Sequence, residues 1–140
     1  MKVVLDTNVI VAAMRSPRGA SAMLVNEALA GRLEIFASPA LFLEYEAVLT
    51  RPHHLAAAGL TRRDIDISLE MLAKTVVPIY PYFTYRPLLP DPDDEMVLEV
   101  AINARADVLV TFEGRTFEQA APRFGLTVMT PAEIYRTLRR

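Results

Sequence analysis

Two carboxylates closely follow apolar runs that predict buried strands. Asp6 comes immediately after residues 2–5, and Glu113 comes two residues after the run that ends at Thr111. Both runs are short, continuous and rich in β-branched side chains, as in parallel sheets. The carboxyl ends of parallel strands share one edge, where ligands of open α/β sheets bind. We therefore expect both acids near this edge. The structural alternative is a turn or helix cap for Asp6 and a solvated loop residue for Glu113.

Two further acids fall on the apolar stripes of predicted helices. Glu44 lies in the helix predicted for residues 39–50, and Asp94 lies in the first turn of the helix predicted for residues 91–104. An unpaired carboxylate that faces a core is costly, so each needs a partner. The structural alternatives are an ion pair or a place at the stripe's edge for Glu44, and helix capping for Asp94. The apolar residues at i+3, i+4 or i+7 spacing are Leu41, Tyr45 and Val48 beside Glu44, and Val97, Leu98 and Ala101 beside Asp94.

These four carboxylates come from four separate segments, which converge if the sheet is parallel. Asp91, Asp93 and Glu95 crowd Asp94, and like charges so close repel unless a cation lies among them. Hard oxygen ligands select Mg²⁺ or Mn²⁺. The chemistry that such a site serves is in-line hydrolysis of a phosphodiester by an activated water molecule.

The composition excludes several other classes of site. The 140 residues, 52% hydrophobic and 23% charged, predict one folded domain over residues 1–140. Without cysteine the chain has no disulfide or thiolate metal site, and two histidines disfavour a zinc site. A formal net charge of −2 disfavours nucleic-acid binding through a large basic surface. Neither a membrane-length apolar stretch nor a signal-peptide pattern is present, so we expect a cytoplasmic protein without membrane contact.

Apolar runs alternate with amphipathic segments, which predicts a three-layer α/β/α fold around a mostly parallel twisted sheet of four to five strands. Ser38 before Pro39 and Thr61 before Asp64 are typical helix starts, whereas Pro78 restricts its strand to an edge or an end. The predicted strands are 2–5, 33–37, 76–79, 107–111 and 126–129. The predicted helices are 20–30, 39–50, 61–74, 91–104, 116–122 and one that begins at 131, with a helix end at 51–54 and an extended loop at 80–90.

Taken in order, these segments resemble the motifs of PIN-domain nucleases, in particular the VapC-like toxin components of prokaryotic toxin–antitoxin pairs. The resemblance covers essentially the whole chain and depends on the ordered set of motifs. The segment Thr-Phe-Glu-Gly-Arg at 111–115 departs from the Gly-Asp or Asn turn of many relatives. The matching segments are 5–8, 38–44 with 48–52, 91–94 with Ala101, 109–111 with Glu113 and Phe117, and 130–133.

The resemblance implies a metal-dependent endoribonuclease with a single PIN-like domain. Asp6, Glu44 and Asp94 match the three core acids, which would bind Mg²⁺ or Mn²⁺, and Glu113 matches a more variable fourth catalytic position. Helical phase and the spacing to Ala101 favour Asp94 over its acidic neighbours as the ligand. The expected supporting polar groups are Asn8, Thr111 and Asp91.

Substrate and partner contacts must come from outside the acid cluster. Arg15, Arg51 and Arg115 are the candidates for RNA phosphates, and each is otherwise an ordinary solvated side chain. The aromatic residues Tyr80, Tyr82, Phe83 and Tyr85 stack on bases or pack their own loop. The resemblance implies a cognate antitoxin partner, and the high hydrophobic content predicts a homodimer.

Three alternatives stay open. A haloacid-dehalogenase-like phosphatase also has an Asp after its first strand but needs a second Asp where this chain has Asn8. A receiver domain needs a lysine late in the chain, whereas the lysines here are Lys2 and Lys74. A catalytically silent PIN fold that binds RNA or protein would keep the same acids.

Overall fold

The computed structural model describes residues 1–82 and 88–140, in which five strands form one parallel sheet. The strand order is β3-β2-β1-β4-β5, and each neighbouring pair is parallel. This confirms the predicted α/β class, and Pro78 lies in an edge strand as expected. The strands are β1 (Lys2–Leu5), β2 (Glu34–Ala37), β3 (Val77–Pro78), β4 (Val108–Val110) and β5 (Thr127–Met129).

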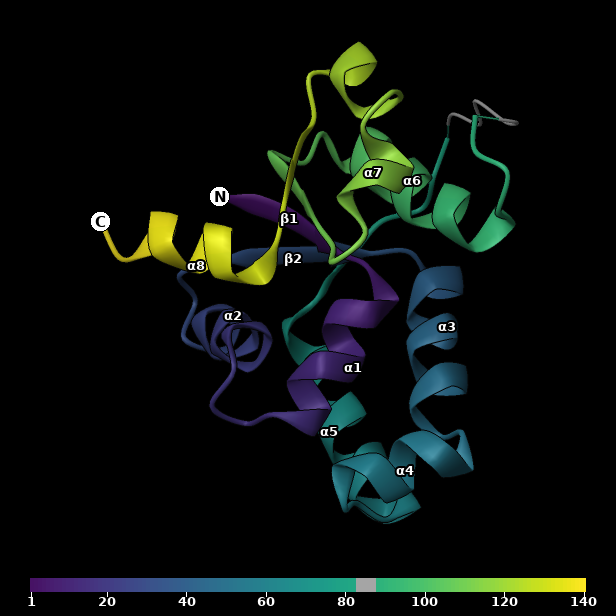
Figure 1. Cartoon of the computed structure of the whole chain (residues 1–140), viewed down its shortest axis with the longest axis vertical. Coiled ribbons are helices and arrows are strands. Elements are labelled where there is room, and N and C mark those ends of the chain that lie inside the picture. The colour runs from purple at the N-terminus through teal and green to yellow at the C-terminus, as the bar shows by residue number, and fades with distance from the viewer. Residues whose placement is uncertain (83–87) are drawn as a thin grey trace.

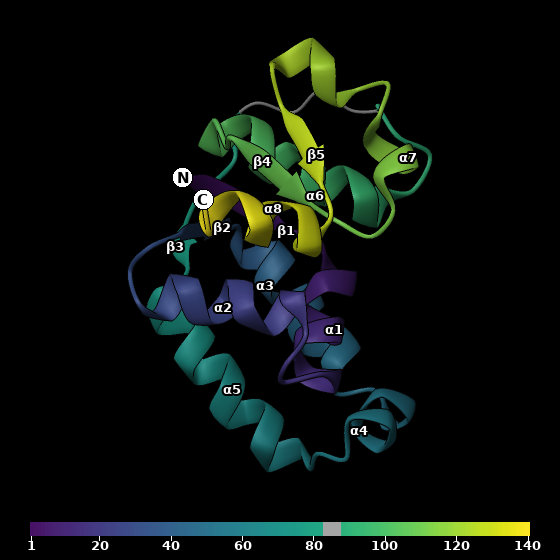
Figure 2. The same cartoon turned by 60° about the vertical axis from the view of Figure 1, so that its left-hand side comes forward.

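Helices cover both faces of the sheet (Figure 1). α6 packs on β1, β2 and β4 on one face, whereas α1, α2, α5 and α8 form the layer on the other face (Figure 2). α3 contacts both α1 and α6 and lies beyond the carboxyl ends of the strands. The main helices are α1 (Thr7–Arg15), α2 (Ala20–Leu29), α3 (Pro39–Leu49), α4 (Pro52–Ala58), α5 (Arg62–Thr75), α6 (Pro92–Ala104) and α8 (Pro131–Leu138).

Side-chain caps begin the helices where the sequence predicts them. The Ser38 hydroxyl accepts a hydrogen bond from the Leu41 amide at 3.0 Å, and Pro39 occupies the first turn of α3. Thr61 and Asp64 form a reciprocal capping box at the start of α5. These local bonds satisfy amides that a helix start otherwise leaves without a partner.

Two helices were not predicted. α1 begins directly after Asp6, although its run Val9-Ile10-Val11 is β-branched and has a low helix propensity. The burial of Val9 and Ile10 in the core outweighs that local preference. α4 begins at Pro52, so the proline that was interpreted as a helix end starts a new helix instead.

The helix predicted for residues 116–122 is also wrong in its bounds. The structure has a short helix α7 (Gly114–Phe117) and a separate 3₁₀ turn η1 (Ala121–Phe124). Pro122 lies in the 3₁₀ turn, where its missing amide breaks no helical hydrogen bond. α7 therefore begins directly after Glu113.

The centre of the sheet is fully buried. Val3, Val4 and Leu5 of β1 have no exposed surface, and the neighbouring β4 is equally enclosed. In the described part of the chain, no helix has both the length and the apolarity that a bilayer crossing requires. Because β1 and β4 are buried, the polar residues that follow them lie at the boundary between the core and solvent.

Candidate functional site: an acidic cluster at the carboxyl ends of β1 and β4

β1 and β4 are neighbours in the sheet although about a hundred residues separate them in the sequence. The chain runs from β1 toward β3 on one side and from β4 to β5 on the other, so the order reverses between these two strands. The Asp6 amide donates to the Val110 carbonyl at 2.9 Å, which extends the pairing to the strand ends. Open α/β sheets bind ligands at such a reversal point.

The Asp6 carboxylate is buried at this point, with 7% of the residue exposed. Oδ1 accepts from the Thr7 amide at 2.8 Å and caps α1, and Oδ2 accepts from the Thr111 hydroxyl at 2.7 Å. Burial raises the pKa of Asp6, these two bonds oppose that rise, and Glu113 and Asp91 add to it. Asp6 is therefore a helix cap and also a member of an acidic cluster.

Thr111 connects the ends of the two strands. Its fully buried hydroxyl donates to Asp6 and accepts from the Glu113 amide at 2.9 Å. The Asn8 side chain contacts the same hydroxyl at 3.5 Å, and its Oδ1 accepts from the Phe112 amide at the same distance. The structure thus brings together Asn8 and Thr111, the supporting groups expected from the sequence, and holds the backbone of Glu113 beside them.

Asp94 lies in the first turn of α6, which begins at the same end of the sheet (Figure 1). Burial raises the pKa of Asp94 to about 6, with further contributions from the charges of Asp91, Asp6 and Glu113. Asp91 caps α6 by accepting from the Asp93 amide at 2.9 Å. The carboxylates of Asp6, Asp94 and Glu113 therefore lie close enough to repel one another.

Glu44 reaches the cluster from α3. The helix buries Leu41, Tyr45 and Val48, and Glu44 lies half-buried beside them. Burial raises the pKa of Glu44, the charges of Asp93 and Asp91 raise it further, and the Arg51 guanidinium partly offsets them. The charge of Glu44 thus interacts with the acids at the start of α6. Among these, Asp91 acts electrostatically on Asp6, Glu44 and Asp94.

A family model for the PIN domain matches residues 2–114. The chain belongs to the PIN-domain family. No curated protein sequence matches it. VapBC2 from Rickettsia felis bound to a DNA fragment from its promoter shares the fold, with a TM-score of 0.64, 17% identity and coverage of 93% of this chain and 98% of that one. VapBC-1 from nontypeable Haemophilus influenzae gives a TM-score of 0.61 at 18% identity, with coverage of 94% and 99%.

The donor set of this PIN domain fits a hard divalent cation. Ion pairs in the described residues join Arg32 to Glu27 and Arg62 to Asp66, so the clustered acids have no cationic partner within 4.0 Å there. Within 1–82 and 88–140, no group of three or more Asp, Glu or His side chains is already placed to hold a metal ion. Mg²⁺ commonly binds through one or two carboxylates and completes its shell with water and substrate oxygens. PIN-domain nucleases generally use divalent metal ions.

The three arginines expected to contact substrate come from three segments of the PIN fold, and Arg15 and Arg51 both act on His54. Arg51 precedes α4 and acts on Glu44 electrostatically, whereas Arg115 is exposed on α7, two residues after Glu113. Arg15 ends α1, and its Nη2 lies 2.6 Å from Nδ1 of His54. The aromatic side chains Tyr80 and Tyr82 are exposed, and Phe83 and Tyr85 lie outside the described residues.

Sequence reasoning missed two residues that position the acids. The fully buried Tyr45 hydroxyl donates to the Leu5 carbonyl at 2.5 Å and so joins α3 to the end of β1. Glu95 is buried and its Oε1 accepts from the amides of Leu88 and Leu89, the latter at 2.8 Å, ahead of Asp91. Tyr45 was interpreted only as an apolar stripe residue, and Glu95 only as one of several first-turn acids.

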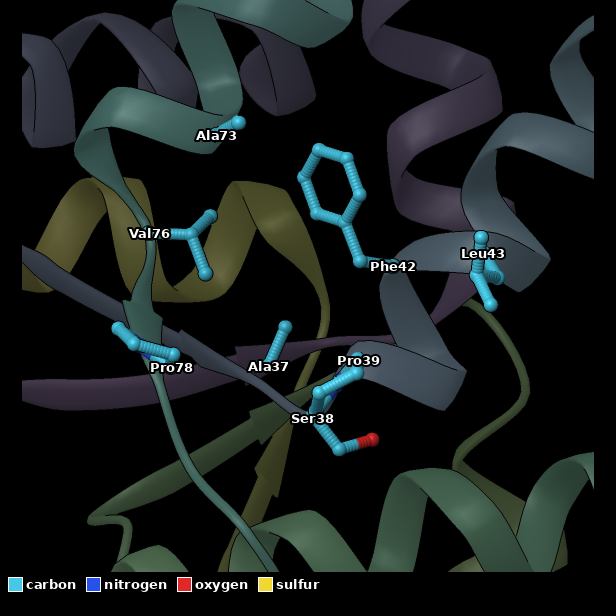
Figure 3. Close-up of a pocket in the computed structure, with 8 residues that line it drawn as sticks. All are labelled: Ala37, Ser38, Pro39, Phe42, Leu43, Ala73, Val76 and Pro78. Carbon is cyan, nitrogen blue, oxygen red and sulfur yellow. The ribbon is translucent and has the colours of Figure 1, made fainter.

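A pocket of about 380 Å³ lies between the start of α3, the end of α5 and the edge strand β3 (Figure 3). Phe42, Leu43, Val76 and Pro78 form much of its wall, and the Ser38 hydroxyl beside it already caps α3. Such a lining offers no ligand to a metal ion or a phosphate. This pocket therefore lacks the carboxylates that the acidic cluster provides.

Proposed function

We propose that this PIN domain is a metal-dependent endoribonuclease, the toxin of a toxin–antitoxin pair, acting in the cytoplasm. The observation that carries the proposal is the convergence of Asp6, after β1, and Asp94, in α6, in one acidic cluster that forms no ion pair with a cation among residues 1–82 and 88–140. The pKa of Asp94 is raised to about 6, because burial and the neighbouring carboxylates disfavour its ionised form. Strongly perturbed carboxylates are typical of catalytic sites.

Asp6, Glu44 and Asp94 would hold Mg²⁺ or Mn²⁺, in keeping with the preference of these ions for carboxylate oxygen. When bound, the ion would supply an activated water molecule and stabilise the leaving oxygen of a phosphodiester. Thr111 orients Asp6 through the bond to Oδ2, and Asn8 orients Thr111. Glu113 adds a fourth carboxylate, held in place through its amide bond to Thr111.

RNA would contact the arginines around the acidic cluster. Arg51 acts electrostatically on Glu44, and Arg115 follows Glu113 by two residues, so cations come from both sides of the acids. Arg15, at the end of α1, lies on the same side as Arg51, because both act on His54. A guanidinium binds a phosphate through two parallel N–H donors, which suits this role.

We further propose an antitoxin partner and a homodimer. The support for the antitoxin is the fold shared with two structures of VapBC complexes. The support for the dimer is the exposure of large apolar side chains on α3 and α5, Leu43, Ile67 and Met71. Light scattering at micromolar concentration tests the dimer, and a monomer there contradicts it.

The test of the nuclease is cleavage of a mixed single-stranded RNA pool by the purified chain. We expect cleavage with Mg²⁺ or Mn²⁺, none with EDTA, and a loss of at least 100-fold in rate for Asp6→Asn and Glu44→Gln. Asp66→Asn is the matched control, since it removes one exposed carboxylate on α5, and it should cleave at the wild-type rate. Cleavage that survives both chelation and Asp6→Asn contradicts the proposal.

A further inference from the structure

Two arginines and two histidines gather where α1 and α3 meet α4, and we call Arg15, Arg51, His53 and His54 the Arg–His cluster. α4 contacts both α1 and α3. Nη2 of Arg15 lies 2.6 Å from Nδ1 of His54, and the rings of His53 and His54 lie 4.1 Å apart between centroids. Three segments of the chain therefore bring their cationic or ionisable side chains to one place.

Among the described residues, no carboxylate forms an ion pair with the Arg–His cluster, although Arg51 acts on Glu44 at longer range. The ion pairs among the described residues involve Arg32 and Arg62, so neither Arg15 nor Arg51 has a carboxylate within 4.0 Å there. Burial lowers the pKa of His54, and so do His53, Arg15 and Arg51. The repulsion within the cluster would be relieved by a bound anion.

The hydrogen-bond pattern of the Arg–His cluster also favours an anion. A guanidinium only donates, so Nδ1 of His54 must accept from Arg15. The neutral ring of His54 then carries its proton on Nε2, which is one more donor. The side chains of the Arg–His cluster thus supply N–H donors, and the oxygens of a phosphate accept hydrogen bonds from such donors.

The Arg–His cluster lies near the acidic cluster, at a distance that an RNA strand can span. Arg15 follows Asp6, the cap of α1, by nine residues, and Arg51 follows Glu44 by seven residues, just beyond the end of α3. At a helical rise of 1.5 Å per residue these offsets are about 10 to 14 Å. A stacked strand advances 3.4 Å per nucleotide, so the offsets correspond to about three to four nucleotides.

We propose that the Arg–His cluster is an RNA phosphate subsite about three to four nucleotides from the bond that is cut. This inference rests on the proposed nuclease function for the identity of its ligand. Arg15 and Arg51 hold one phosphate of the strand that leaves the acidic cluster over α4, and His54 fixes Arg15. The subsite binds the backbone of the strand and carries no preference for a base.

The experiment measures binding of a fluorescein-labelled 12-nucleotide oligouridylate by anisotropy, in EDTA, from 50 to 300 mM salt. The variant is Arg15→Gln/Arg51→Gln, and the control is Arg123→Gln/Arg136→Gln, which removes the same charge from exposed positions on η1 and α8. Each phosphate contact to a single strand contributes about −0.7 to the slope of log K against log salt. We expect the cluster variant, which loses one phosphate contact, to lose about 0.7 from the slope and to bind about 5-fold more weakly at 100 mM salt, with the control unchanged.

Equal loss in both double variants overturns the subsite, because the effect would then follow net charge alone. Absence of binding by the wild-type chain overturns it as well. Thermal unfolding of each variant checks that the exposed substitutions leave the fold intact. Binding in EDTA is independent of cleavage, so a chain that binds through the cluster but cleaves no RNA refutes the nuclease and keeps the subsite. A chain that cleaves RNA while its cluster variant binds normally refutes the subsite alone.

Discussion

Replacing Asp94 by asparagine should stabilise the metal-free protein although it removes a proposed metal ligand. Asp94 lies among Asp91, Asp6 and Glu113, and burial together with these charges raises its pKa from 3.8 to about 6. A folded-state pKa above the unfolded value means that ionisation opposes folding. The penalty is absent below pH 3.8, grows as the pH rises, and is complete above about pH 6.

The magnitude follows from the size of that shift. A shift of about 2 units at 1.36 kcal/mol per unit sets a ceiling of about 3 kcal/mol. Asp94 is partly exposed, so solvent screening reduces this value, and the dipole of α6 favours a first-turn charge by about 0.5 kcal/mol. We therefore expect Asp94→Asn to gain about 1 kcal/mol at pH 7.5. For 140 residues this gain raises Tm by about 3 °C.

Thermal unfolding in EDTA at pH 4 and pH 7.5 measures this effect. The Asp94→Asn gain should be present at pH 7.5 and vanish at pH 4, whereas the Asp66→Asn control should be neutral at both. Adding Mn²⁺ should raise the Tm of the wild type more than the Tm of Asp94→Asn, because an ion stabilises only a folded protein that binds it. A lower Tm for Asp94→Asn in EDTA at pH 7.5 would refute the view that Asp94 carries uncompensated charge.

Two further predictions concern the groups that position the acids. Tyr45→Phe leaves the buried Leu5 carbonyl without its partner, so we expect urea denaturation to show a loss of about 1 to 2 kcal/mol, and a change below 0.5 kcal/mol would contradict the role of that bond. Thr111→Val removes the donor to Asp6 Oδ2, so calorimetric titration with Mn²⁺ should show about 10- to 100-fold weaker binding with the fold intact. Unchanged Mn²⁺ affinity in Thr111→Val would show that Thr111 is only structural.

Local chemistry made most of the fold predictable. Ser38, Thr61 and Thr130 cap their helices as their sequence contexts indicate, and the apolar runs become parallel strands in the expected places. α1 was not predicted because its β-branched residues disfavour a helix, and only burial under α2 and α3 reverses that preference. α4 was missed because a proline both ends and begins helices.

The candidate site was predictable in outline because helical phase and strand ends are visible in a sequence. The inward stripe of α3 identified Glu44, and the end of β1 identified Asp6. The pairing of β1 with β4 is a tertiary fact, so no local pattern reveals that Thr111 donates to Asp6. The same reason hid Tyr45, whose hydroxyl finds its partner 40 residues away.

The most direct test of the account is an anomalous diffraction map from a crystal of the whole chain soaked in Mn²⁺. We predict a peak in the acidic cluster, with carboxylate oxygens of Asp6 and Asp94 at about 2.1 Å, the distance typical of such hard cations. The peak should be absent from Asp94→Asn crystals treated in the same way. A map without density between Asp6 and Asp94, or with its Mn²⁺ bound at some other place, would contradict the claim that these carboxylates converge to hold a metal ion.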